Sequence, residues 1–170
     1  KYFSGKPLIA HTIEHALATS YIDRIIVDTD SEEIAKISRE NGAEVPFIRP
    51  ADLAQDTSQA IDNIIYTLNK LKEDDGYDPT HVFILQTTSP LREVEDIDKC
   101  WDLMQRSNAT TVLTVCSTHP RLYHLTEDND IVLVNGTEAA STNIQDWPPG
   151  YILNGCFVYI IETKALLKER

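Results

Sequence analysis

Side chains that suit a small polar ligand are concentrated in the loop at residues 86–92, which reads Gln-Thr-Thr-Ser-Pro-Leu-Arg. The loop follows the apolar run Val-Phe-Ile-Leu at 82–85, which we expect to belong to a buried strand over residues 81–86. Its hydroxyls and amide fit a polyhydroxylated ligand, and its guanidinium fits a carboxylate or a phosphate. The hydroxyls could equally cap the helix that follows. Arg92 also has two candidate roles, because it could meet a ligand or pair with Glu95 or Asp96 of that helix.

Two further stretches carry polar groups, one at the end of an apolar run and one within such a run. Residues 49–57 begin with Arg49-Pro50 and hold two aspartates, Asp52 and Asp56. Arg49 either donates to a ligand or forms an ion pair with Asp52 or Asp56 that orders the loop. Asn154-Gly155 lies within an apolar run, where the glycine permits a close backbone approach and the asparagine presents an amide. The alternative for this pair is a bulge or a hairpin turn.

His11 and His15 match the H-x-x-E-H spacing of inverted zinc proteases. The spacing places both imidazoles on one face of a helix, as zinc binding requires. That face lies nearly opposite Ile9 and Ile13, so we expect both histidines to face solvent. The sequence offers no third ligand, and we assign no metal site to this chain.

The order of apolar patterns predicts the elements that position these loops. β-Branched or apolar runs indicate strands, and apolar residues at helical spacing indicate helices. Their alternation predicts an α/β fold with a mostly parallel sheet and helices on both faces. Ligands of such sheets bind at the carboxyl ends of the strands, here after residues 28, 48, 86 and 116. The predicted strands are 24–28, 44–48, 81–86, 110–116 and one within 151–161, and the predicted helices are 7–20, 31–41, 57–72, 93–106 and 163–170.

Composition limits the classes of function. The chain has 170 residues and a net charge of −12, and such an acidic surface repels nucleic-acid phosphates. No apolar run reaches the roughly 18 residues of a membrane-spanning helix. Three widely spaced cysteines form no disulfide framework, which favours a reducing compartment, the cytoplasm. We expect a single domain over 1–170, cut at both ends, with a turn-rich insert or dimerisation segment at 117–150.

Six short stretches, taken in order, resemble the acylneuraminate cytidylyltransferases, also called CMP-sialic acid synthetases. Each stretch is a weak signal alone, but the six occur in the order of the family, at suitable spacings, through nearly the whole chain. The related Kdo cytidylyltransferases have Gly-Asp-Glu-Pro after the glutamine, which this chain lacks. The stretches are Gly-Lys-Pro-Leu-Ile-Ala at 5–10, Asp-Arg-Ile-Ile-Val at 23–27, Ala-Glu-Val-Pro-Phe at 43–47, Arg-Pro-Ala-Asp-Leu-Ala at 49–54, the loop at 85–92 and Leu-Asn-Gly at 153–155.

The resemblance implies a fold, an activity and a set of site residues. The fold would be of the nucleotide-diphospho-sugar transferase type, which is Rossmann-like. Such enzymes transfer CMP from CTP to a nonulosonic acid and release pyrophosphate with Mg²⁺, commonly as homodimers. A non-catalytic nucleotide-binding, sugar-binding or oligomerisation module is the alternative function. The implied nucleotide-binding residues are Arg49, Asp56 and Thr57, and the implied substrate-binding residues are Gln86, Thr87, Thr88, Ser89, Arg92, Gln145, Asn154 and Gly155.

Several departures from the family pattern bear on these implications. Thr87 replaces the usual proline of the loop, and Ile144-Gln145 replaces an Arg-Gln pair that meets the sugar carboxylate. Val158 stands where a tyrosine is common. The triphosphate loop and the Mg²⁺-binding aspartates would lie outside residues 1–170. We therefore name no catalytic residue, and the resemblance does not fix which nonulosonic acid is used.

Overall fold

The computed structural model describes residues 1–170 except 56–57, 121, 135–147, 156 and 169–170. The chain divides into two compact units. The first unit comprises residues 1–113 and 156–170, and the second comprises residues 114–155. The segment 117–150 that we singled out falls within the second unit. No described helix is both long and apolar enough to cross a membrane.

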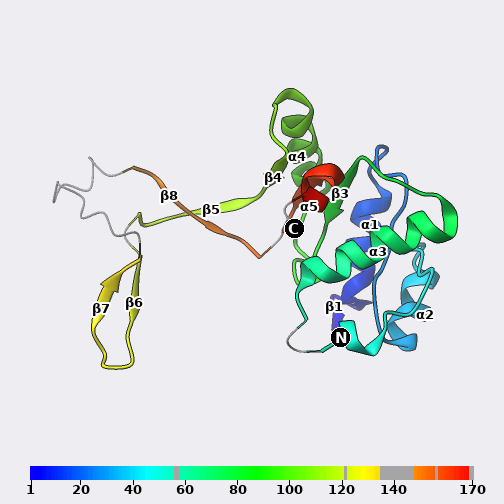
Figure 1. Ribbon diagram of the computed structural model, residues 1–170, viewed down its shortest axis with the longest axis horizontal. Coiled ribbons are helices and arrows are strands. Elements are labelled where there is room, and N and C mark those ends of the chain that lie inside the picture. Colours follow the sequence, from blue (N-terminus) through cyan, green and yellow to red (C-terminus); the bar gives the residue numbers. More distant parts are fainter. Residues whose placement is uncertain (56–57, 121, 135–147, 156, 169–170) are drawn as a thin grey trace. The chain divides into compact units, whose positions relative to one another are not determined.

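A three-stranded sheet forms the centre of the first unit (Figure 1). Strand β9 (Tyr159–Glu162) lies between β3 (His81–Ile84) and β4 (Thr111–Leu113) and is antiparallel to both. Strands β3 and β4 therefore run in the same direction without pairing to each other. The described strand pairs are antiparallel, so the mostly parallel sheet is not confirmed.

Parallel pairing is present at one place, an isolated bridge between Ile26 and Glu44. The amide of Val27 donates to Glu44 O at 2.9 Å, and the amide of Glu44 donates to Ile25 O at 2.8 Å. The predicted strands 24–28 and 44–48 are thus reduced to this bridge. Two backbone hydrogen bonds fix their neighbouring positions but do not extend into a ladder.

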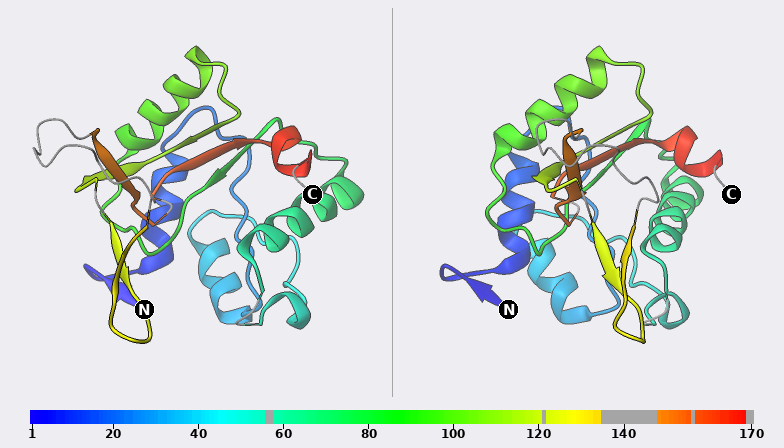
Figure 2. Two further views of the ribbon diagram at one scale, coloured as in Figure 1. Left: turned by 60° about the vertical axis from the view of Figure 1, so that its left-hand side comes forward. Right: turned by 90° about the vertical axis from the view of Figure 1, so that its left-hand side faces the viewer.

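Helices cover both faces of the sheet (Figure 2). Successive side chains of β9 point to opposite faces, so each face carries an apolar cluster against which helices pack. On one face α4 (Val94–Arg106) packs against Ile160. On the other face α3 (Ala60–Asp75) and α5 (Thr163–Lys168) pack against Ile161. The predicted layers of helix on sheet on helix are present in this unit.

The remaining elements of the first unit precede α3. They are β1 (Tyr2–Phe3), β2 (Lys6–Pro7), α1 (Leu8–Leu17), α2 (Glu32–Glu40) and the 3₁₀ turn η1 (Ala51–Leu53). Ser31 Oγ accepts a hydrogen bond from the amide of Ile34 and caps α2. Gly76 ends α3 at φ 67°, a left-handed position that favours glycine.

The second unit consists of two antiparallel ribbons. Strand β5 (Val115–Thr118) pairs with β8 (Gly150–Leu153), and β6 (Tyr123–Leu125) pairs with β7 (Ile131–Leu133). The predicted strand 110–116 is therefore divided at Thr114 between two sheets. The predicted strand within 151–161 is likewise divided into β8 and β9.

The buried position of Ile160 generates the first prediction. Its side chain is 0% exposed between β3, β4 and α4, so Ile160→Ala should lower the free energy of unfolding by about 2–5 kcal/mol. The matched control is Leu103→Ala on α4, whose side chain is 51% exposed and should cost less than about 1 kcal/mol. Urea denaturation followed by circular dichroism measures both, and equal losses would contradict the packing described.

Candidate active site

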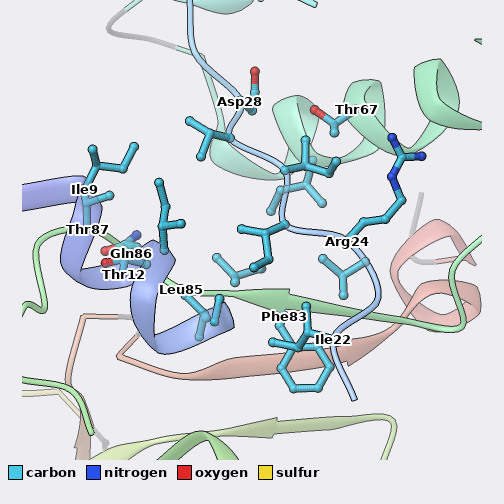
Figure 3. A pocket seen from close by; sticks show the side chains of 18 of the residues that line it. Ile9, Thr12, Ile22, Arg24, Asp28, Thr67, Phe83, Leu85, Gln86 and Thr87 are labelled. Carbon is cyan, nitrogen blue, oxygen red and sulfur yellow. The ribbon is translucent and has the colours of Figure 1, made fainter. Parts of the chain in front are cut away.

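The first unit contains a cavity of about 1020 Å³ between α1, residues 22–28, β3 and α3. Figure 3 shows its apolar walls, with Ile22 and Phe83 toward one end. Polar residues from the predicted ligand loops line it as well: Asp28, Thr29, Asp30, Arg49, Gln86, Thr87 and Thr88. The cavity therefore brings together the loops that follow residues 28, 48 and 86, as expected of strand ends in an α/β domain.

Arg49 is held between two acidic residues from another segment. Its guanidinium lies 3.4 Å from Asp28 Oδ2 and 3.4 Å from Asp30 Oδ1, and its backbone amide donates to Thr29 O at 2.9 Å. Our structural alternative for Arg49 named Asp52 or Asp56, but the described partners are Asp28 and Asp30. The bridge between Ile26 and Glu44 explains this pairing, because it places the ends of both runs side by side.

The guanidinium of Arg49 retains capacity to donate. Both ion-pair distances exceed the usual 2.7–3.2 Å of an N–H···O hydrogen bond, and its Nε is buried without a partner among the described residues. With its amide oriented to satisfy both of its bonds, Asn63 of α3 accepts from Arg49 Nη1 at 2.8 Å and donates to Leu53 O at 3.0 Å. Arg49 is thus held in place by Asn63 of α3 and by two carboxylates. Its Nε can still donate a hydrogen bond to a further group.

The carboxyl of Asp28 is partly withdrawn from water. Burial raises the pKa of Asp28 above the ordinary aspartate value, and the charge of Arg49 opposes that rise. Oδ1 of Asp28 is buried and has no hydrogen-bond partner among the described residues. An acceptor of this kind suits a donor on a ligand or on another segment of polypeptide.

The loop at 86–92 is organised by Arg92 from within. Arg92 is 2% exposed, and its Nη2 donates to Gln86 O at 2.8 Å while its Nε donates to Phe157 O. Burial lowers the pKa of Arg92. These backbone contacts give the guanidinium a structural role, with carbonyl partners in place of the carboxylates of Glu95 or Asp96 that we named. Its position at 2% exposure leaves little access for a sugar carboxylate.

Gln86 differs from our expectation in two respects. Strand β3 ends at Ile84, two residues earlier than predicted, and its four residues are half-buried. The side chain of Gln86 is exposed, and its Oε1 lies 3.5 Å from Thr88 Oγ1. β3 is less buried than its apolar sequence predicts because it lines the cavity. The amide of Gln86 is consequently accessible to a ligand.

The other predicted site residues are distributed between the two units. Ser89 accepts a backbone hydrogen bond from Arg92 at 3.3 Å and is half-buried, outside the cavity lining. In the second unit, Asn154 Oδ1 accepts from Thr114 Oγ1 at 2.7 Å. Gly155 adopts φ 71° with open space where a Cβ would stand, so backbone conformation and not close approach favours glycine there. Asp56, Thr57 and Gln145 lie outside the described residues.

The two histidines of α1 are half-buried, which corrects our expectation of a solvated face. His11 Nε2 lies 2.9 Å from Phe3 O, and the Phe3 ring packs edge-on against the imidazole. Burial lowers the pKa of His15, and the charge of Arg92 adds to this shift. The helical spacing alone did not predict these contacts, because they come from β1 and from the 86–92 loop. Among the described residues, no group of three or more His, Cys, Asp or Glu could hold a metal ion.

Asn63 and Thr12 also belong to this region, although we did not predict a role for either from the sequence. Asn63 lies on α3, and Thr12 lies on the apolar face of α1 with its hydroxyl buried. A polar residue within the apolar stripe of a helix was the available signal for Thr12. Nothing in the local sequence indicated that Asn63 would face Arg49.

Comparison with known proteins identifies the family. Residues 1–143 match the family described as Cytidylyltransferase. The chain belongs to this family. It is 45% identical over 97 residues to the CMP-N,N'-diacetyllegionaminic acid synthase of Legionella pneumophila, covering 57% of this chain and 41% of that protein. It is 30% identical over 173 residues to the pseudaminic acid cytidylyltransferase of Campylobacter jejuni, covering 98% of this chain and 72% of the relative.

A solved structure shows the fold of this cytidylyltransferase-family chain. The CMP:2-keto-3-deoxy-manno-octonic acid synthetase complexed with CTP superposes with a TM-score of 0.69 at 14% identity. The match covers 99% of this chain and 68% of that chain. The chain therefore has the α/β fold of the nucleotide-diphospho-sugar transferases. The aligned region spans under half of the legionaminic relative and under three quarters of the pseudaminic relative.

The buried guanidinium of Arg92 generates the second prediction. Arg92→Met should lower the free energy of unfolding by at least about 1–3 kcal/mol, because two backbone carbonyls lose their donor. The control is Arg106→Met, since Arg106 Nε donates to Asp102 O in an exposed position. Guanidinium chloride titration measures the difference, and an Arg92 variant as stable as the Arg106 variant would refute the structural role.

Proposed function

We propose that the protein containing this chain transfers CMP from CTP to a nonulosonic acid and releases pyrophosphate. The observation that carries the proposal is the family match over residues 1–143, together with two relatives whose names state this class of reaction. The meeting of Arg49 and the 86–88 loop at one cavity supports it. Nothing found in the described residues favours the alternative of a non-catalytic module.

Each group in the proposed site has a role that fits its chemistry. Arg49 would donate from its planar guanidinium to the carbonyl edge of cytosine, because its Nε is unpartnered and its ion pairs are long. Gln86 would bind the sugar through its exposed amide. The remaining proposed contacts are Asp56 and Thr57 to the nucleotide, and Thr87, Thr88, Ser89, Gln145, Asn154 and Gly155 to the sugar.

The proposed reaction is an in-line displacement at the α-phosphorus of CTP. The anomeric hydroxyl oxygen of the sugar forms the new P–O bond, the α–β bridging P–O bond breaks, and the hydroxyl proton is released. Positioning of the two substrates and neutralisation of phosphate charge supply most of the rate enhancement for such a step. The residues described here contribute orientation of cytosine and sugar, and none is assigned as the general base.

Mg²⁺ is expected from the family resemblance, but the described residues do not fit it. Asp28 and Asp30 are the carboxylates nearest to Arg49, and both are engaged with its guanidinium. No cluster of three metal-binding side chains is found in the part of the chain that the structure describes. We propose that the ligands of Mg²⁺ come from outside residues 1–170, and we route no step through the metal.

The parallel sheet also belongs to this proposal. The bridge between Ile26 and Glu44 has parallel hydrogen bonding, and β3 and β4 share a direction. These features support a mostly parallel sheet in the complete domain.

We also propose that the protein functions in the cytoplasm, because Cys100 and Cys116 are both free thiols.

A homodimer formed through the second unit is a further part of the proposal. Two-stranded ribbons are marginally stable alone, and the described residues of the second unit include none of the buried core residues. A second copy of the same ribbons would cover this surface, since isologous interfaces are the commonest among oligomers. Large apolar side chains that are 40–69% exposed there are Val115, Tyr123, Leu125, Ile131, Val132, Val134, Tyr151, Ile152 and Leu153.

The third prediction tests base recognition by Arg49 in an active preparation of the protein. Arg49→Lys keeps the charge but removes the planar fork, so the KM for CTP should rise roughly 5- to 150-fold, equivalent to about 1–3 kcal/mol. The melting temperature should change little.

Arg24→Lys is the matched control for that prediction. Arg24 lines the same cavity, and its guanidinium pairs with Glu44 and Asp75, so its substitution should lower stability without changing the KM for CTP. If Arg49→Lys instead lowers the melting temperature and leaves the KM unchanged, Arg49 has only a structural role.

The fourth prediction concerns the proposed dimer. Leu125 and Ile131 form a cross-strand pair between β6 and β7 and are 67% and 69% exposed. Ile131→Lys should shift the protein toward monomer in sedimentation velocity, because a buried lysine charge opposes association. Leu103→Lys places the same charge on an exposed site of the first unit and should leave association unchanged. A dimer that survives Ile131→Lys would remove β6 and β7 from the interface.

A further inference from the structure

One carboxamide on α3 joins the guanidinium of Arg49 to the turn that follows Arg49 in the sequence. In the orientation that satisfies both ends of its amide, Asn63 accepts from Arg49 Nη1 at 2.8 Å and donates to the carbonyl of Leu53 at 3.0 Å. Leu53 is the last residue of η1, so the backbone from Arg49 to Leu53 and these two hydrogen bonds form a closed ring. The ring ties the direction of the guanidinium to the backbone that carries it.

The ion pairs of Arg49 are too long to set that direction. Both lie at 3.4 Å, beyond the usual range of an N–H···O hydrogen bond. The side chain of Asp30 is 54% exposed, so water also screens its attraction for the guanidinium. Among the described residues, the bond to Asn63 is the one side-chain contact of Arg49 at ordinary hydrogen-bond length. The amide therefore orients the guanidinium, and the two carboxylates balance its charge.

The residue that orients Arg49 is neutral, which suits a guanidinium that has a further group to bind. A carboxylate at the same distance would form a charge-assisted pair with the guanidinium and compete with a ligand for its donors. The oxygen of an amide accepts a hydrogen bond without adding a negative charge. Arg49 Nε is buried without a partner among the described residues and keeps its donor for another acceptor. Asn63 thus fixes the fork of Arg49 without neutralising it.

The backbone around Arg49 has hydrogen bonds of its own that do not depend on Asn63. The amide of Arg49 donates to Thr29 O at 2.9 Å, and the amide of Leu53 donates to Pro50 O at 3.0 Å. Removal of the Asn63 amide therefore leaves the turn with part of its support. It leaves the guanidinium with its two long ion pairs alone, so the larger effect falls on the orientation of Arg49.

We propose that Asn63 is a positioning residue for base recognition, which orients the guanidinium of Arg49 for donation to cytosine without touching the nucleotide itself. This inference rests on the proposed function, because it requires that Arg49 bind cytosine. Arg49 is among the residues that line the cavity and Asn63 is not, as expected of a residue that acts through another. Helix α3, which packs on the sheet through Leu68, thereby contributes to CTP affinity.

Asn63→Ala in an active preparation of the protein tests the proposal. Alanine removes both hydrogen bonds and favours a helix. CTP affinity, measured by isothermal titration calorimetry without the sugar, should fall roughly 3- to 10-fold, the loss expected of one neutral hydrogen bond. The KM for CTP should rise by a similar factor while kcat stays within about twofold, because the lost interaction serves binding and not the chemical step. The matched control is Asn69→Ala at an exposed position of the same helix, which should change neither quantity.

A double-mutant cycle with Arg49→Lys shows whether Asn63 acts through Arg49. Lysine lacks the planar fork, so in that background Asn63→Ala should change CTP affinity by less than about twofold. An equal loss in both backgrounds would overturn the proposal. A lower melting temperature with unchanged CTP affinity would overturn it as well, because Asn63 would then only support the turn at Leu53.

The single variants distinguish base recognition by Arg49 from positioning by Asn63. If Arg49→Lys leaves CTP affinity unchanged, Arg49 does not bind cytosine, and the role of Asn63 is refuted with it. If Arg49→Lys weakens CTP binding and Asn63→Ala does not, base recognition stands and the role of Asn63 alone is refuted.

Discussion

Strand β9 is the element on which the first unit depends. It pairs with β3 and β4, and its Ile160 and Ile161 enter the two apolar clusters on opposite faces of the sheet. Residues 156–170 return to the first unit after the excursion through residues 114–155. Without β9, β3 and β4 would have no common partner and the helices of the two faces would lose their shared support.

The same region of chain positions the ligand loop. Phe157, two residues before β9, accepts a hydrogen bond from Arg92, and Arg92 also donates to the carbonyl of Gln86. The backbone of Gln86 is thus held by a buried guanidinium, which is also bound to the segment preceding β9. This arrangement explains how a polar loop at a sheet edge is kept in place, and it assigns Arg92 to the support of the site.

Local sequence patterns predicted most of the helices because their capping groups and apolar spacing are local. The predicted helices 31–41 and 57–72 overlap α2 and α3, although α3 extends three residues further, to Asp75, with Gly76 as its cap. The strands were less predictable, because the run at 110–116 is divided between two sheets by partners more than thirty residues away. The predicted parallel order also could not foresee that β9 would be inserted between β3 and β4, since insertion depends on long-range pairing.

The sequence indicated which loops would meet more clearly than which atoms would be in contact. Family resemblance and polar loops indicated Arg49 and Gln86, and both line one cavity. The partners of Arg49 were missed because Asp28 and Asp30 reach it through the bridge at Ile26 and not through the local loop. The solvated face assigned to the two histidines of α1 was wrong, since both are half-buried and His11 packs against Phe3 of β1.

The central claim is that Arg49 and Gln86 bind the two substrates at one edge of this cavity. A crystal structure of the active protein with CTP tests it most directly. The account predicts cytosine within hydrogen-bond distance of the Arg49 guanidinium, with the Gln86 amide facing the sugar side of the nucleotide. Cytosine bound elsewhere, with Arg49 still paired only with Asp28 and Asp30, would contradict it.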